Sequence, residues 1–125
     1  MYKRQEEYLV EAGVDFNSGE DAVRMLVEKN IPFDAIFCFT EMSALGAKNY
    51  LQATGGRIPQ NVSIACMSGT ELSKLVYPTI TAVEQPVELM AETASKIIIE
   101  KLESPAMTNK TIVLDAETVY RESTL

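Results

Sequence analysis

The hydrophobic positions of the chain form short apolar runs that alternate with helix-like stripes. The segment "EYLVEAG" reads as a short strand. In "NSGEDAVRMLVEKN" the apolar residues recur at the spacing of one helix face, and Ser18 is the expected N-cap, with Asp21 three residues further on. The runs "DAIFCF" and "VSIACM" are apolar at successive positions, which is typical of parallel strands buried on both faces.

Between these two runs, "EMSALGAKNYLQAT" predicts a helix that ends at Gly55-Gly56, where a left-handed C-cap favours glycine. The order strand, helix, strand, helix, strand indicates a parallel sheet with right-handed crossovers. The sequence therefore predicts an α/β fold, in which a three-layer parallel sheet carries helices on both faces.

The second half of the chain is less regular. "SGTELSKLVYP" predicts about one helical turn, "TITAVEQ" alternates like a strand, and "KTIVLDAETVYRES" holds one or two terminal strands. A helix is expected from Pro86 onward, because proline suits the first helical position. Its apolar stripe consists of Val87, Met90, Ala91, Ala94 and Ile98. We interpret residues 1–5, "MYKRQ", as a vector or sequencing scar and residues 6–125 as the domain.

The amino-acid composition limits the classes of function that the chain can have. The chain has 125 residues, 46% hydrophobic and 23% charged, which suits one ordinary globular domain. Its net charge of −7 is spread along the chain and repels phosphate backbones and anionic membranes, so this chain itself is not expected to bind DNA. Cys38 and Cys66 lie in apolar runs, which indicates buried thiols in a reducing compartment, and we expect the cytoplasm.

The sequence contains no histidine. This excludes Ser-His-Asp and Cys-His nucleophile systems and every histidine-containing metal site, and two isolated cysteines do not build a thiolate zinc site. An enzyme, including a small flavodoxin-like one, is therefore disfavoured. We expect no cofactor and no metal.

Polar residues follow three of the predicted strands: Thr40-Glu41, Ser68-Gly69-Thr70 and Glu84-Gln85. In open α/β sheets, ligands bind beyond the carboxyl ends of the strands. Two interpretations remain open at this point. In the first, Thr40 and Ser68 are helix and turn caps, and Glu41 offsets the helix dipole. In the second, the three strand ends together form a small-molecule pocket.

Four segments, "SALGA", "RIPQNVSIA", "PTITAVEQP" and "YRESTL", resemble in order and spacing the effector-binding domain of LacI/GalR-type bacterial transcription regulators. The resemblance covers most of the chain from about Leu9 onward. It implies one lobe of a two-lobed, periplasmic-binding-protein-like (type I) domain, with the effector between the lobes. The DNA-binding head and the first lobe are expected to be absent, so that operator DNA is bound only through the missing head.

The resemblance also implies roles for individual residues. Phe16 stands where an aromatic ring packs on the effector, Thr40 and Glu41 take the place of an Asn-Asp pair, Ser68 takes the place of an effector-binding Asp, and Gln85 keeps the family residue. The chain departs from the family pattern at two places: Thr40-Glu41 replaces Asn-Asp, and Ser68-Gly69 replaces Asp-Asp. The implied effector is a sugar or another small molecule.

Members of this family dimerise through the corresponding lobe. The residues expected at a homodimer interface here are Met42, Leu45, Leu72, Leu75 and Val76. The function that the sequence favours is the ligand-sensing lobe of a DNA-binding transcriptional regulator. The alternative is a fragment of a secreted sugar-binding protein of an ABC transporter, which shares the fold.

Overall fold

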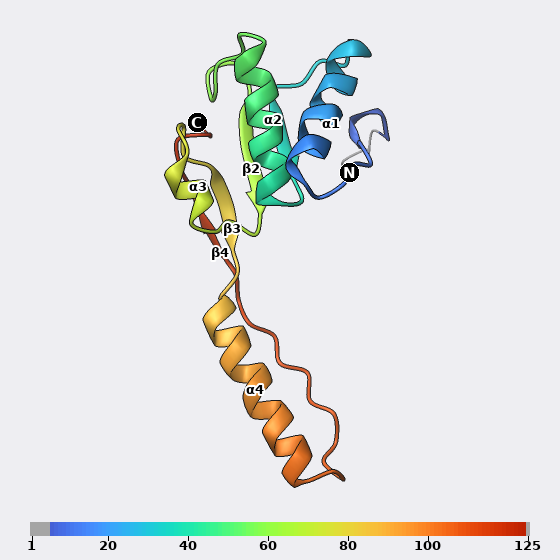
Figure 1. Cartoon of the computed structure of the whole chain (residues 1–125), viewed down its shortest axis with the longest axis vertical. Coiled ribbons are helices and arrows are strands. Elements are labelled where there is room, and N and C mark those ends of the chain that lie inside the picture. The colour runs from blue at the N-terminus through green and yellow to red at the C-terminus, as the bar shows by residue number, and fades with distance from the viewer. Residues whose placement is uncertain (1–5, 125) are drawn as a thin grey trace, which may run out of the picture. The chain divides into compact units, whose positions relative to one another are not determined.

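A computed structural model describes residues 6–124 of the chain (Figure 1). Residues 1–5, interpreted above as a scar, and Leu125 lie outside the described residues. Contacts divide the described chain into two compact units, residues 6–84 with 118–124 and residues 85–117. We describe each unit by itself.

The order of elements confirms the α/β class. In chain order they are η1 (Glu6–Tyr8), α1 (Phe16–Glu28), β1 (Ala35–Cys38), α2 (Glu41–Ala53), β2 (Ser63–Met67), α3 (Leu72–Leu75), β3 (Thr81–Glu84), α4 (Val87–Glu103) and β4 (Glu117–Val119). The sheet has the strand order β1-β2-β3-β4, and β1, β2 and β3 are parallel.

Helix α2 forms as the sequence predicts. Thr40 is its N-cap, and its C-terminus ends in a left-handed turn in which Gly55 has φ 87° and the Gly56 amide donates to the Leu51 carbonyl at 2.8 Å. Side chains pay a steric cost in this backbone region, which explains a glycine there. Helix α1 begins two residues earlier than its predicted N-cap. Asp15, not Ser18, is the cap, because its carboxylate accepts a hydrogen bond from the Ser18 amide at 2.8 Å.

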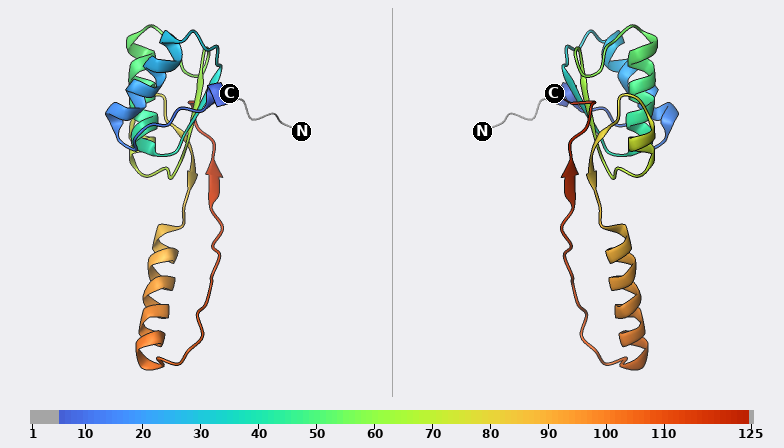
Figure 2. Two further views of the ribbon diagram at one scale, coloured as in Figure 1. Left: turned by 90° about the vertical axis from the view of Figure 1, so that its right-hand side faces the viewer. Right: turned by 90° about the vertical axis from the view of Figure 1, so that its left-hand side faces the viewer.

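The core of the first unit lies between the sheet and helices α1 and α2, which Figure 2 shows on one side of the sheet. Ile64 and Cys66 of β2 and Ile80, just before β3, are fully buried there. Strand β1 differs from the expectation of two buried faces. It is the outer strand of the sheet, and Phe37 and Phe39 are 63% and 72% exposed. Helices therefore cover β1 on one face in this structure, not on both.

The expected strand in "EYLVEAG" is not formed. Glu6–Tyr8 is a short 3-10 helix and the residues from 9 to 13 have no regular secondary structure. A cavity of about 220 Å³ separates part of this segment from β1 and is lined by Val10, Ala12 and Phe37 among others. The segment therefore runs near the free edge of β1 without pairing with it.

The second unit contains α4 and the chain that follows it. No residue of α4 is buried, and all five residues of the predicted apolar stripe are exposed. Pro86 is the N-cap residue of α4, and the helix begins at Val87, one residue later than predicted. In the C-terminal segment a single strand, β4, forms where one or two were expected.

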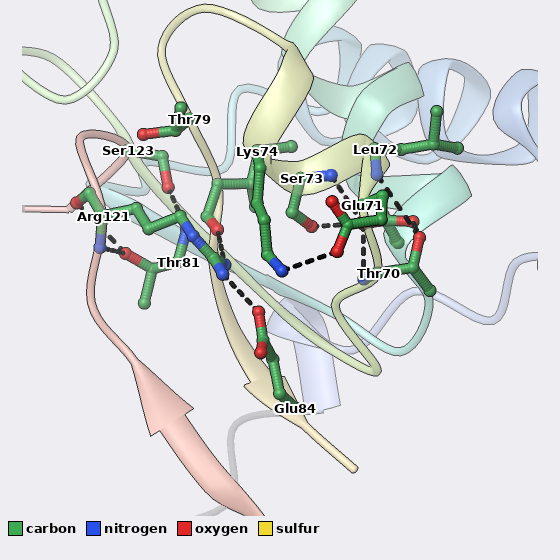
Figure 3. A network of polar contacts seen from close by, with 12 residues as sticks. Thr70, Glu71, Leu72, Ser73, Lys74, Thr79, Thr81, Glu84, Arg121 and Ser123 are labelled. Carbon is green, nitrogen blue, oxygen red and sulfur yellow. Dashed lines mark hydrogen bonds and ion pairs between the residues drawn. The ribbon is translucent and has the colours of Figure 1, made fainter. Parts of the chain in front are cut away.

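The last described residues are hydrogen-bonded to β2 and β3 (Figure 3). The buried Ser123 hydroxyl donates to the Ile64 carbonyl at 2.6 Å and accepts from the Thr81 amide at 2.8 Å. Arg121 donates to the Ile80 carbonyl at 2.8 Å and pairs with Glu84, and its own amide donates to the Thr81 hydroxyl. The "YREST" segment thus joins the two central strands at one end.

This arrangement predicts that Ser123→Ala destabilises the first unit by about 1–3 kcal/mol, because a buried donor and a buried acceptor lose their partner. Urea titration followed by NMR signals of β2 and β3 measures the effect. Ser95→Ala is the matched control, since the Ser95 hydroxyl only bonds the Ala91 carbonyl on the exposed α4. Equal unfolding midpoints for Ser123→Ala and the unchanged chain would contradict the assignment.

Candidate functional site

The carboxyl ends of β1, β2 and β3 lie at one edge of the sheet, because the three strands are parallel and Cys38 pairs with Cys66, which in turn pairs with Ala82. The residues that follow β1 and β2 at this edge are Thr40, Glu41 and Ser68. Gln85 follows β3 directly but is the first residue of the second unit. The edge of the first unit therefore brings together three of the five residues predicted to bind an effector.

Thr40 is an N-cap with an additional role. Its hydroxyl accepts a hydrogen bond from the Ser43 amide at 3.1 Å, and the Ser43 hydroxyl accepts from the Thr40 amide at 3.3 Å, which completes a capping box. The Thr40 hydroxyl also donates to the Val14 carbonyl at 2.7 Å. It therefore fixes the chain that leads into α1 against the start of α2.

Glu41, the first residue of α2, is only 6% exposed. Its Oε1 accepts hydrogen bonds from the Thr70 amide at 2.8 Å, from the Ser73 amide at 2.7 Å and from the Ser73 hydroxyl, and its Oε2 accepts from the Thr70 hydroxyl at 2.5 Å. Oε1 therefore takes three of the donors and Oε2 takes one, so that Oε2 keeps one of the roughly four acceptor positions of a carboxylate. The carboxylate joins α2 to the β2–α3 loop, and its contact with an effector stays a prediction.

The protonation of Glu41 follows from these contacts. Burial alone raises the pKa of a carboxyl group, but the hydrogen bonds from Ser73 and Thr70 outweigh burial and hold the pKa of Glu41 below its usual value. The carboxylate form is therefore the one that the fold contains near neutral pH.

Ser68 ends β2 in a left-handed backbone conformation with φ 65°, which is uncommon for a residue other than glycine. Its amide donates to the Val83 carbonyl at 2.9 Å, so the turn is bonded to β3. This backbone places residue 68 at the start of the loop that Glu41 holds.

Phe16 is half-buried at the start of α1, and close packing of α1 on α2 fixes its backbone. A Cβ added to Gly46 would lie 1.9 Å from the Phe16 carbonyl oxygen, and one added to Gly19 would lie 2.1 Å from the Ser43 carbonyl oxygen. Larger residues at these two positions would push the helices apart. The glycines therefore bring Phe16 near the first turns of α2.

The sequence interpretation placed Thr70 at this edge but missed Ser73, and it did not predict that both residues bind Glu41. Ser73 is fully buried, although it lies in a short helix between exposed leucines. The signal in the sequence is two hydroxyl residues, three positions apart, directly after a strand end. That spacing fits hydrogen bonding to one acceptor, but nothing local indicates that the acceptor lies 29 to 32 residues earlier.

The expected interface residues lie on α2 and on and after α3. Met42, Leu72 and Leu75 are 40%, 44% and 77% exposed, whereas Leu45 and Val76 are half-buried and pack against the core. Glu41 connects the two elements, because it precedes Met42 and bonds Ser73, the neighbour of Leu72. Leu72 and Leu75 are thus exposed, whereas Ser73, which lies between them in the sequence, is buried.

The two thiols are part of the core. Burial raises the pKa of Cys38 and of Cys66 to about 11, and in Cys38 the neighbouring Cys66 adds to this effect. Such thiols carry very little thiolate near neutral pH, which agrees with packing rather than reactivity. Within residues 6–124, no group of three or more acidic, cysteine or histidine residues is arranged to hold a metal ion, and no helix is long and apolar enough to cross a membrane.

The chain belongs to the periplasmic binding protein-like domain family, whose model matches residues 2–124. Within that family it matches the effector-binding domain of LacI-type transcriptional regulators.

Curated relatives include the ribose operon repressor of Haemophilus influenzae, 29% identical over 116 residues, which cover 93% of this chain and 35% of the repressor. The transcriptional regulator MalR of Clostridium butyricum is 34% identical over 111 residues, which cover 87% of this chain and 33% of MalR. The chain thus spans about a third of the length of these relatives. They are transcriptional regulators rather than enzymes.

Solved structures agree. The complex of the regulator CelR with cellobiose matches with a TM-score of 0.90 at 25% identity, over 97% of this chain and 37% of CelR. A LacI-family regulator from Enterococcus faecalis with bound ribose matches with a TM-score of 0.84 at 25% identity, over 93% of this chain and 43% of that protein. These matches confirm the fold and the resemblance to LacI-type regulators.

The hydrogen bonds of Glu41 predict a pH-dependent contribution to stability. Because its folded pKa lies below the usual value of 4.5, its contribution is full above about pH 4.5 and is lost as the pH falls through the folded pKa. Glu41→Gln should destabilise the first unit by about 1–3 kcal/mol at neutral pH, since the amide group cannot accept all four bonds.

Urea titrations of the two proteins between neutral and acidic pH measure this difference, which should shrink below about pH 4.5. Glu71→Gln is the control, because Glu71 is an exposed carboxylate that pairs only with Lys74 on the same short helix. A difference between Glu41→Gln and the unchanged chain that stays constant with pH would refute the prediction.

Proposed function

We propose that the chain is the C-terminal, ligand-sensing lobe of a cytoplasmic LacI-type transcriptional regulator that responds to a sugar or a related small molecule. The observation that carries the proposal is the match in fold between this chain and regulators solved with cellobiose and with ribose. Phe16, Thr40, Glu41, Ser68 and Gln85 are the proposed effector-site residues.

The proposed mechanism is a population shift. An effector bound against the strand ends favours one arrangement of this lobe relative to a first lobe, and that preference changes the spacing of DNA-binding heads carried by the longer protein. The acidic chain itself contributes no DNA contact, because its net charge of −7 repels phosphates.

Within the site, Ser68 is the residue that we propose to set effector chemistry. Family members carry a carboxylate at this position, which accepts two sugar hydroxyls through charge-assisted bonds, whereas a serine offers one hydroxyl. The loss of such a contact costs about 1.5–3 kcal/mol. The effector is therefore expected to be a modified or less hydroxylated sugar, or a sugar held mainly by the other site residues.

Ser68→Asp tests this assignment in the intact two-lobed domain. Aspartate tolerates the left-handed backbone of residue 68, so the variant should fold and should bind ribose or cellobiose about ten- to a hundredfold more tightly by calorimetry. Ser68→Asn is the matched control, because it keeps the shape and lacks the charge. No binding of either sugar by any of the three proteins would count against a sugar effector.

The dimer interface gives a separate prediction. We propose that Met42, Leu45, Leu72, Leu75 and Val76 form an isologous contact between two copies of the lobe. Leu75→Glu should convert the full-length regulator from dimer to monomer at micromolar concentration in sedimentation experiments, because it places a charge in an apolar contact. Val27→Glu, an equivalent change at an exposed position of α1, should leave the dimer intact. A monomeric unchanged protein would exclude this interface.

A further inference from the structure

Glu41 connects the proposed effector site at the strand ends with the proposed dimer interface on α3. On one side, Thr70 lies two residues after Ser68, at the strand ends where an effector is proposed to bind. On the other, Ser73 lies between Leu72 and Lys74 in α3, whose exposed leucines belong to the proposed dimer interface. Both Thr70 and Ser73 donate their amide and their hydroxyl to the Glu41 carboxylate.

We propose that Glu41 is a positioning residue that transmits a change at Ser68 to Leu72 and Leu75, so that effector binding and subunit contact are coupled through its carboxylate. This proposal rests on the proposed function and specifies how the site is regulated. In this role Glu41 acts through its hydrogen bonds to Thr70 and Ser73, in addition to the effector contact proposed for it above.

The geometry supports transmission through the carboxylate. Four donors from Thr70 and Ser73 bind it, three of them at Oε1, and only 6% of the residue is exposed. Charge-assisted hydrogen bonds in a site with little water are strong and directional, so the loop and α3 are expected to move together with the start of α2.

The other end of α3 is also fixed. The Ile80 amide donates to the Ser73 carbonyl at 2.9 Å, which attaches the same residue to the chain entering β3. The loop begins where the Ser68 and Gly69 amides both donate to the Val83 carbonyl, at 2.9 and 3.2 Å. A displacement of residue 68 therefore has a short path to Leu72 and Leu75, with Glu41 as the acceptor for both intermediate residues.

The coupling can be measured without a ligand, because Ser68→Asp changes charge and size at the strand end. In the 125-residue chain, Ser68→Asp should shift the methyl NMR signals of Leu72 and Leu75. In a Glu41→Gln background the same substitution should shift them about fivefold less, which is the scale of a measurable coupling. In a Glu71→Gln background the response should remain, since Glu71 contacts Lys74 and not the loop donors.

The Ile64 methyl signal checks that each variant is folded, because Ile64 is fully buried in β2. If Glu41→Gln unfolds the first unit, Thr70→Val replaces it and Leu75 alone is read. This variant removes the hydroxyl bond to Oε2 and also the 3.4 Å bond that the Leu72 amide donates to the same hydroxyl. An equal response of Leu72 and Leu75 to Ser68→Asp with and without the Glu41 bonds would overturn the proposal.

The proposed function is tested by a different measurement. In the full-length regulator, ribose or cellobiose should change the dimer dissociation constant, and Glu41→Gln should remove that change while the dimer still forms. Absence of sugar binding in the unchanged regulator would contradict the proposed sugar response alone. Sugar binding with an unchanged linkage to dimerisation in Glu41→Gln would contradict the role of Glu41 alone.

Discussion

The buried carboxylate of Glu41 constrains the whole carboxyl edge of the sheet. An ionised group that is 6% exposed is costly unless its lone pairs are satisfied, so the β2–α3 loop must present its donors to this position. Thr70 and Ser73 supply two amides and two hydroxyls. The path of the loop at Thr70 and the placement of α3 therefore depend on one side chain at the start of α2.

A second constraint brings α1 to the same edge. Gly19 and Gly46 allow the backbones of α1 and α2 to touch, and the Thr40 hydroxyl bonds the Val14 carbonyl just before α1. The polar groups of Thr40 and Glu41 thus assemble the edge. The effector-binding groups expected at this edge become, in this structure, groups that also hold its three segments in place.

The sequence predicts those parts of the fold whose signals are local. The N-cap of α2 at Thr40 and its end at Gly55 follow from capping and glycine preferences within a few residues. Strand β2 forms as predicted, but only its alternate residues Ile64 and Cys66 are buried, not both of its faces. The segment from 7 to 13 reads as a strand, but strand pairing depends on a distant partner, β1, and the segment forms a short 3-10 helix followed by irregular chain. The burial of Glu41 was missed for the same reason, because its four donors come from residues 29 and 32 positions away.

At this edge, some polar residues are needed for the fold, and others can be substituted without changing it. Glu41 cannot be changed without leaving buried donors unpaired, whereas the left-handed backbone conformation of residue 68 is one that asparagine and aspartate also adopt. A residue of this second kind can vary between relatives while the fold stays constant. The matched structures hold cellobiose in one case and ribose in another, on folds with TM-scores of 0.90 and 0.84 to this chain. This variety of sugars on one fold is consistent with our proposal, in which contacts such as those of Glu41 fix the scaffold and positions such as residue 68 select the ligand.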